Sequence, residues 1–153
     1  MNLDNVQIGL MGGVRDLPVT VSELEAKYPE ADMFGVLPAY ALYCRHAKDV
    51  TIRNFGATLE APDVRPAVLM DDVKGLDFNA VNAASPDSRQ PLVRFDNVRD
   101  AFVHGCRVTN NVTKFLFAAG SATRNVHLFG NELSLAGLAV VVAPEVPKDE
   151  VKW

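Results

Sequence analysis

The sequence predicts an all-β fold, a parallel β-helix of about five coils with one insertion that contains a loop and a short helix. One pattern recurs every 25 or 26 residues, and its apolar residues alternate over short stretches, as they do in strands rather than in helices. Residues suited to sharp turns recur at fixed places between these stretches. Such regularity is typical of a chain that turns at the corners of stacked coils.

Length and composition predict a single domain over residues 1–153. Of the 153 residues, 48% are hydrophobic and 22% are charged, which suits a protein with a substantial core. The net charge of −4 argues against a nucleic-acid partner. The longest apolar run, 133–144, is too short to cross a bilayer, and residues 1–5 lack the features of a signal peptide.

The repeat is clearest in four segments: 47–52, 73–78, 98–103 and 123–128. A fifth copy, 3–8, places Val6 44 residues before Val50, so an insertion interrupts the first repeat. Alternation predicts that two columns of apolar residues point inward. These columns are Val50, Leu76, Ala101 and Val126, and Ile52, Phe78, Val103 and Leu128.

Each repeat reads as three short strands joined at two-residue corners. The second residue of each corner is expected to adopt a left-handed backbone, which glycine, asparagine and aspartate tolerate best. Ala80 is the single exception to that chemistry. The corner positions are Asp49, Gly75, Asp100 and Asn125, and Asn54, Ala80, Gly105 and Gly130.

A leucine-rich repeat is the alternative solenoid. Residues 123–131 fit its consensus, with Val126, Leu128 and Asn131 at the defining positions. The rest of such a repeat should be helical, yet 66–70 and 91–95 are strand-like and begin with proline. The β-helix is therefore favoured, with coils stacked at about 4.8 Å.

The insertion covers residues 11–38 and differs from the coils. Ser22-Glu23-Leu24-Glu25 reads as a capping box, so we expect a short helix that ends before Pro29. The segment of about 138–153 is expected to cap the C-terminal end of the stack. Strand 6–10 at the other end is expected to be an open edge, which predicts self-association through the first coil.

Several polar columns follow from the same alignment. Arg45, Asp71 and Asp96 should share one outward column. A basic stripe along one corner comprises Lys48, Lys74, Arg99 and Arg124. The histidines, His46, His104 and His127, fall in three different columns, so no metal site is expected. Cys44 and Cys106 are two coils apart, and we expect buried free thiols.

Two stretches carry a resemblance to a known family. Residues 28–47 read YPEADMFGVLPAYALYCRHA, and residues 65–73 read RPAVLMDDV. Both resemble the polygalacturonases and their relatives, glycoside hydrolase family 28, and the likeness covers about the first two-thirds of the chain. The resemblance implies a right-handed parallel β-helix and inverting hydrolysis of galacturonic-acid chains without a cofactor. It implies a periplasmic or secreted location for a full-length parent.

The catalytic motifs of that family, Asn-Thr-Asp, Asp-Asp, Gly-His-Gly and Arg-Ile-Lys, are not found in order. Asp71-Asp72 belongs to a later corner of the repeat, and His104-Gly105 lacks the first glycine. We therefore expect the C-terminal coils of a pectin-type glycosidase, with no catalytic residue of its own and an acidic polysaccharide as partner.

The expected sugar contacts lie around the base of the insertion: Phe34, Tyr40, Arg45 and His46. Two alternatives remain open, a minimal polysaccharide-active enzyme that uses Asp71 and Asp96, and an interaction solenoid of the leucine-rich kind.

Overall fold

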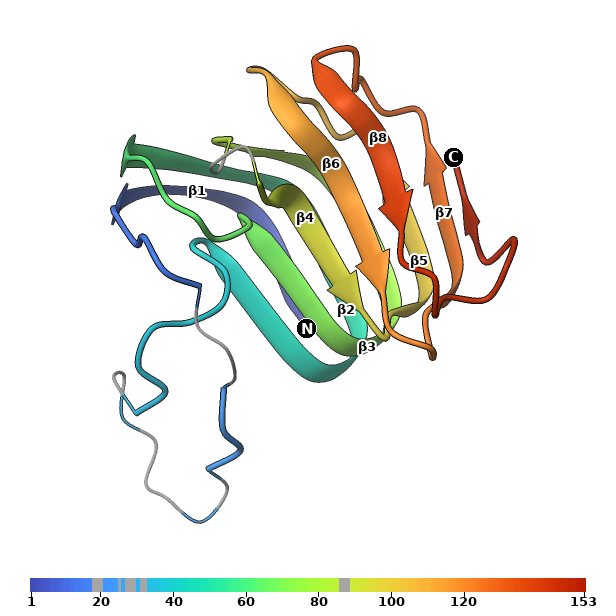
Figure 1. Ribbon diagram of the computed structural model, residues 1–153, viewed down its shortest axis with the longest axis horizontal. Coiled ribbons are helices and arrows are strands. Elements are labelled where there is room, and N and C mark those ends of the chain that lie inside the picture. The colour runs from blue at the N-terminus through green and yellow to red at the C-terminus, as the bar shows by residue number, and fades with distance from the viewer. Residues whose placement is uncertain (18–20, 25, 27–29, 31–32, 86–88) are drawn as a thin grey trace.

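The protein is a parallel β-solenoid. The computed structural model describes residues 1–17, 21–24, 26, 30, 33–85 and 89–153. Nine strands and no helix lie within this part of the chain, and every ladder between strands is parallel (Figure 1). The strands are β1 (Asn2–Gly12), β2 (Leu42–Ala61), β3 (Val68–Ala83), β4 (Pro91–Asp96), β5 (Arg99–His104), β6 (Val112–Ala119), β7 (Arg124–Phe129), β8 (Ala136–Val142) and β9 (Val151–Lys152).

The solenoid has three faces. We call the first face the sheet formed by the starts of β2 and β3 with β4, β6 and β8. The second face contains the middle of β2 and β3 with β5, β7 and β9. The ends of β2 and β3 form the third face, where most of β1 pairs with β2. The prediction of a parallel β-helix is confirmed.

The stack comprises about four turns rather than the five expected. The inward column continues from Val50 to Val151, which pairs with Val126. The first turn is incomplete among the described residues, because β1 contributes only to the second and third faces. The last turn is also incomplete there, with β8 on the first face and β9 on the second. Residues 138–153, expected to form a cap, include most of β8 as well as β9, and these strands extend the sheets.

The corner prediction is confirmed at all eight positions, where φ lies between 48° and 74°. Ala80 follows the rule with φ 52°, although its side chain gives it no advantage there. A third corner column was not predicted: His46, Asp72 and Asn97 have φ of 52°, 50° and 56°. In the next turn the chain has Gly120 at φ 85°.

The inward columns form one continuous core. Ile52, Phe78 and Val103 are register partners on successive coils, and each is buried. Phe78 also meets Phe95 edge to face, with ring centroids 6.0 Å apart. Cys44 and Cys106 are buried free thiols, as predicted.

The insertion expected at 11–38 begins two residues later, because Met11 and Gly12 belong to β1 and Gly12 pairs with Ala61. Its described residues leave the stack as a long excursion (Figure 1). The short helix expected there is absent from the described residues: Val21–Leu24 are irregular and residue 26 lies in a turn. The rest of the expected helix, with Glu25, Tyr28 and Pro29, lies outside the described residues. The irregular backbone of Val21–Leu24 has a physical reason, since one capping box and one apolar pair stabilise so short a helix only weakly.

A buried ion pair ties the base of the insertion to the stack. Asp63 is 1% exposed, and its two carboxylate oxygens accept hydrogen bonds from Nε and Nη2 of Arg65 at 2.8 and 2.7 Å. The backbone N–H of Val14 also donates to Asp63, at 3.3 Å, and Arg65 reaches the carbonyl of Leu37 at 3.3 Å. Both ends of the insertion therefore meet at this ion pair.

The two ends of the stack carry open strand edges among the described residues. β1 pairs with β2 alone, and Leu3, Val6, Ile8 and Leu10 pack only partly buried against the core. Self-association through this edge stays a prediction. The described part of the chain contains no helix long and apolar enough to cross a membrane.

Candidate functional site

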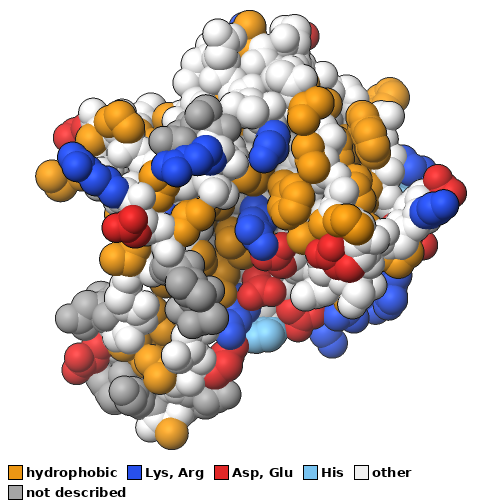
Figure 2. Space-filling view, viewed as in Figure 1, with side chains coloured by type: hydrophobic (Ala, Val, Ile, Leu, Met, Phe, Trp, Pro, Cys, Tyr) orange, Lys and Arg blue, Asp and Glu red, His pale blue; other side chains and the backbone are white. Residues whose placement is uncertain are grey.

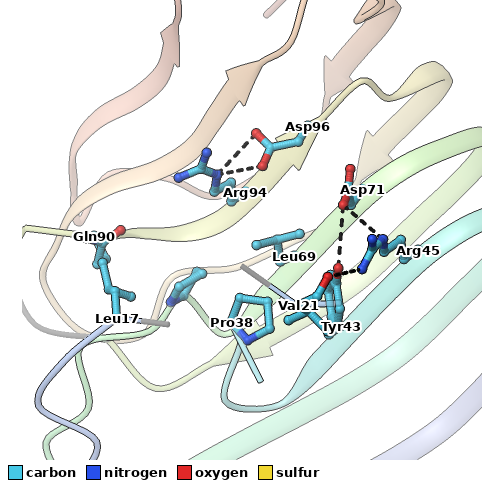
Figure 3. Close-up of a pocket in the computed structure, with 11 residues that line it drawn as sticks. Leu17, Val21, Pro38, Tyr43, Arg45, Leu69, Asp71, Gln90, Arg94 and Asp96 are labelled. Carbon is cyan, nitrogen blue, oxygen red and sulfur yellow. Dashed lines mark hydrogen bonds and ion pairs between the residues drawn. The ribbon is translucent and has the colours of Figure 1, made fainter. Parts of the chain in front are cut away.

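A pocket of about 320 Å³ lies on the first face, beside the insertion (Figure 3). Figure 2 shows acidic and basic side chains gathered in the hollow between the insertion and the stack. The lining combines apolar residues of the insertion with polar residues of β2, β3 and β4. It comprises Leu17, Val21, Pro38, Tyr43, Arg45, Pro66, Leu69, Asp71, Gln90, Arg94 and Asp96.

Two outward columns of the first face form the floor of the pocket. Arg45, Asp71 and Asp96 are register partners on β2, β3 and β4, so the predicted outward column is confirmed. The second column, two residues earlier, contains Tyr43, Leu69 and Arg94. Because side chains at i and i+2 of a strand share a face, the two columns stand side by side.

Arg94 and Asp96 form an ion pair along one strand. Nε of Arg94 donates to the two oxygens of Asp96 at 3.1 and 2.9 Å. The guanidinium carbon lies 5.5 Å from the centroid of the Phe117 ring, within the range of a cation–π contact. No residue of the described chain accepts a hydrogen bond from the two terminal amino groups of Arg94 in the structure, so these donors remain available to a ligand.

Arg45 connects the pocket to the insertion. Its Nη1 donates to the carbonyl of Val21 at 2.9 Å, and its Nη2 forms an ion pair with Glu23. The ion pair with Asp71 is longer, at 3.6 Å. Asp71 is therefore less well compensated than Asp96.

Asp71 has an unusual environment for a carboxylate. Burial raises its pKa, and the nearby negative charge of Asp96 raises it further, while Arg45 acts in the opposite direction. The Tyr43 hydroxyl lies 3.5 Å from Asp71 Oδ2, at the limit of a hydrogen bond. This arrangement favours the neutral acid more than is usual for aspartate.

His46 lies beside the pocket at the corner of β2. Its Nδ1 is 2.9 Å from Asp72 and its Nε2 is 3.0 Å from Glu23. Hydrogen bonding to these two carboxylates raises the pKa of His46. His46 and Arg45 together hold Glu23 of the insertion against the stack.

The four expected sugar contacts have different positions. Arg45 lines the pocket and His46 stands next to it. Phe34 is 44% exposed on the insertion and does not line this pocket. Tyr40 is a core residue, only 6% exposed, and its hydroxyl donates to the carbonyl of Ala84 at 2.5 Å. A side chain so enclosed offers no ring face to a sugar.

Tyr43, Gln90 and Arg94 are pocket residues that the sequence analysis did not single out. The signal for two of them was present, since Tyr43 and Arg94 precede Arg45 and Asp96 by two residues and so share their face. Gln90 lies before the start of β4, so no strand alternation indicates where its side chain points.

The other predicted polar features lie away from the pocket floor. Lys48, Lys74, Arg99 and Arg124 are register partners, so the basic stripe is confirmed as a column. The three histidines occupy three columns, as expected. No group of three potential metal ligands occurs among the residues that the structure describes.

Comparisons with protein-family models, with curated proteins and with solved structures find no match to this chain. What is established for this chain is therefore its parallel β-solenoid fold and the pocket on the first face.

Proposed function

We propose that this chain is a polygalacturonase-like β-helix that binds an acidic polysaccharide in the pocket on the first face and does not by itself hydrolyse it. The observation that carries the proposal is the pair of guanidinium groups, Arg45 and Arg94, at a pocket open to solvent on the outside of the stack. Arginine presents paired donors that match the two oxygens of a carboxylate.

Arg94 is the better placed of the two arginines. Only Nε is engaged by Asp96, so the terminal amino groups can receive the carboxylate of a uronic acid. Arg45 is already shared between Glu23, the Val21 carbonyl and Asp71. We therefore assign the ligand carboxylate to Arg94.

The remaining lining suits a sugar. Tyr43, Gln90 and Asp96 provide hydroxyl, amide and carboxylate groups that can exchange hydrogen bonds with ring hydroxyls. Leu69 and the apolar residues of the insertion provide surface for the C–H face of the ring. This combination of apolar walls with a few polar groups is the usual character of a small-molecule site. The resemblance to family 28 supports a galacturonate chain as the ligand.

Hydrolysis is the second candidate, and one observation favours it. Asp71 and Asp96 are register partners, so two carboxyl groups stand about one coil apart in the same pocket. An assay for new reducing ends on polygalacturonate separates the two functions. Binding alone leaves the number of reducing ends unchanged.

Replacing Arg94 with alanine is expected to weaken binding of an oligogalacturonate by about 10- to 100-fold in calorimetric titration, because it removes charge-assisted hydrogen bonds worth about 1.5–3 kcal/mol. The matched control is Arg53→Ala. Arg53 also pairs with an aspartate, Asp77 at 3.2 Å, but lies on the second face. The control should bind like the wild type.

A neutral oligosaccharide of equal length should bind the wild type weakly and should be insensitive to Arg94→Ala. Equal losses in both arginine variants, or no binding of oligogalacturonate to the wild type, contradict the proposal.

A further inference from the structure

We infer that Asp71, which stands beside Asp96 and is the less well paired of the two, takes up a proton as the pH falls, and that the loss of this negative charge enables the pocket to capture an anionic sugar. The inference rests on the proposed function, because the ligand is the acidic polysaccharide assigned above. It concerns when the pocket binds that ligand.

The geometry brings the two carboxyl groups together. Asp71 and Asp96 are paired positions on the adjacent parallel strands β3 and β4, and both line the pocket. Adjacent strands lie about 4.8 Å apart, so two outward side chains at paired positions are neighbours (Figure 3). Two carboxylates this close disfavour simultaneous ionisation.

The surrounding groups favour a proton on Asp71. Asp96 is paired with Nε of Arg94 at 2.9 Å, whereas Asp71 has only the 3.6 Å contact with Arg45. Arg45 is also bound to Glu23, which reduces its ability to compensate Asp71. Asp96 is therefore the better compensated of the two carboxyl groups.

The charged and titratable groups around Asp71 come from three elements. β2 contributes Tyr43 and Arg45, with His46 at its corner; β4 contributes Arg94 and Asp96; the insertion contributes Glu23 through Arg45. Burial and Asp96 both raise the pKa of Asp71, in agreement with the geometry.

The charge of the pocket lining becomes more positive in consequence. With Asp71 ionised, two arginines balance two aspartates among the lining residues. With Asp71 protonated, the lining has an excess of one positive charge. The neutral acid can also donate a hydrogen bond to a carboxylate oxygen of the ligand, whereas an ionised Asp71 would repel that carboxylate.

The ligand itself does not supply this dependence above mildly acidic pH. A sugar carboxyl group beside ether oxygens resembles an α-carboxyl, with a pKa of roughly 3.5. Its charge is therefore constant between pH 7 and pH 5. A change in affinity over that interval comes from the protein.

The test is calorimetric titration of oligogalacturonate at pH 7, 6 and 5 with the wild type and with Asp71→Asn. We expect wild-type affinity to rise by about tenfold as the pH falls, as one removed charge repulsion predicts. Asp71→Asn should bind tightly at pH 7, and its affinity should change less with pH than that of the wild type. Asp100→Asn, at an exposed corner of the second face, should behave like the wild type. Because His46 also titrates, the difference between wild type and Asp71→Asn isolates the contribution of Asp71.

NMR titration of the side-chain carboxyl carbons tests the protonation of Asp71 without any ligand. The midpoint of Asp71 should lie above the ordinary aspartate range and should fall in Asp96→Asn. A midpoint in the ordinary range, or one unchanged by Asp96→Asn, overturns the inference, as does equal pH dependence of binding in wild type and Asp71→Asn.

The outcomes separate the two proposals. Binding at every pH without the predicted dependence overturns the inference and leaves the proposed function standing. A raised midpoint for Asp71 together with no binding at any pH overturns the proposed function, and the capture step falls with it.

Discussion

Replacing Phe78 with alanine is expected to lower the free energy of unfolding by about 3–5 kcal/mol. The side chain is 0% exposed and lies between Ile52 and Val103 in the stacked core. It also meets Phe95 edge to face at an interplanar angle of 86°. Because hydrogen-bonded coils on both sides fix the spacing of the stack, the cavity left by the ring cannot collapse easily.

Urea titration followed by circular dichroism measures this loss. The matched control is Lys74→Ala on the same strand, since Lys74 is exposed and no described residue bonds its side chain; its effect should stay within about 0.5 kcal/mol. Asp77 is unsuitable as a control, because it accepts hydrogen bonds from Arg53 at 3.2 Å and from His104 at 2.7 Å. Similar losses in Phe78→Ala and Lys74→Ala would contradict the inward register.

Replacing Asp63 with alanine is expected to destabilise the protein by about 3–5 kcal/mol, because it removes one partner of a buried ion pair. The Arg65 side chain is only 13% exposed and would keep its charge without a counter-ion. The backbone N–H groups of Val14 and Arg65 would also lose their acceptor. The insertion should loosen from the stack as a result.

The loss caused by Asp63→Ala should depend on pH. Hydrogen bonds and charge from Arg65 hold the pKa of Asp63 below its ordinary value of 3.8, although burial opposes them. The stabilisation by Asp63 is therefore complete above that value and is lost as the pH falls through the lower folded-state pKa. Chemical denaturation at pH 7 and at pH 2.5 should show a smaller difference between wild type and variant at the lower pH. A difference independent of pH, or none at pH 7, would contradict this role.

The solenoid could be predicted from the sequence because its determinants repeat. An inward column needs only a period of about 25 residues with alternation inside it, and Ile52, Phe78 and Val103 satisfy both. Corner residues reveal themselves when they are asparagine, aspartate or glycine. Ala80 was found only because its register with Gly105 required a corner there.

The pocket could be predicted in part. Arg45, Asp71 and Asp96 follow from the period, and Arg94 follows from the alternation within β4. The wall formed by Leu17 and Val21 could not be predicted, because the insertion has no repeat with which to align it.

The burial of Tyr40 also follows from the repeat register. Leu42 is the register partner of Val68, and the same offset places Tyr40 beside Pro66. The backbone N–H of Tyr40 donates to the carbonyl of Pro66 at 2.9 Å. Tyr40 thus belongs to the entry of a coil, where side chains turn inward. The family resemblance suggested a sugar contact for its aromatic ring, whereas the structure buries that ring in the core.

The most direct test of the account is to map the bound sugar on the protein. Amide shifts of isotope-labelled protein would be followed during titration with oligogalacturonate at pH 5. The account predicts the largest changes on the first face, at Tyr43, Leu69 and Arg94. Changes concentrated along the basic stripe of Lys48, Lys74, Arg99 and Arg124, or no changes at all, would contradict it.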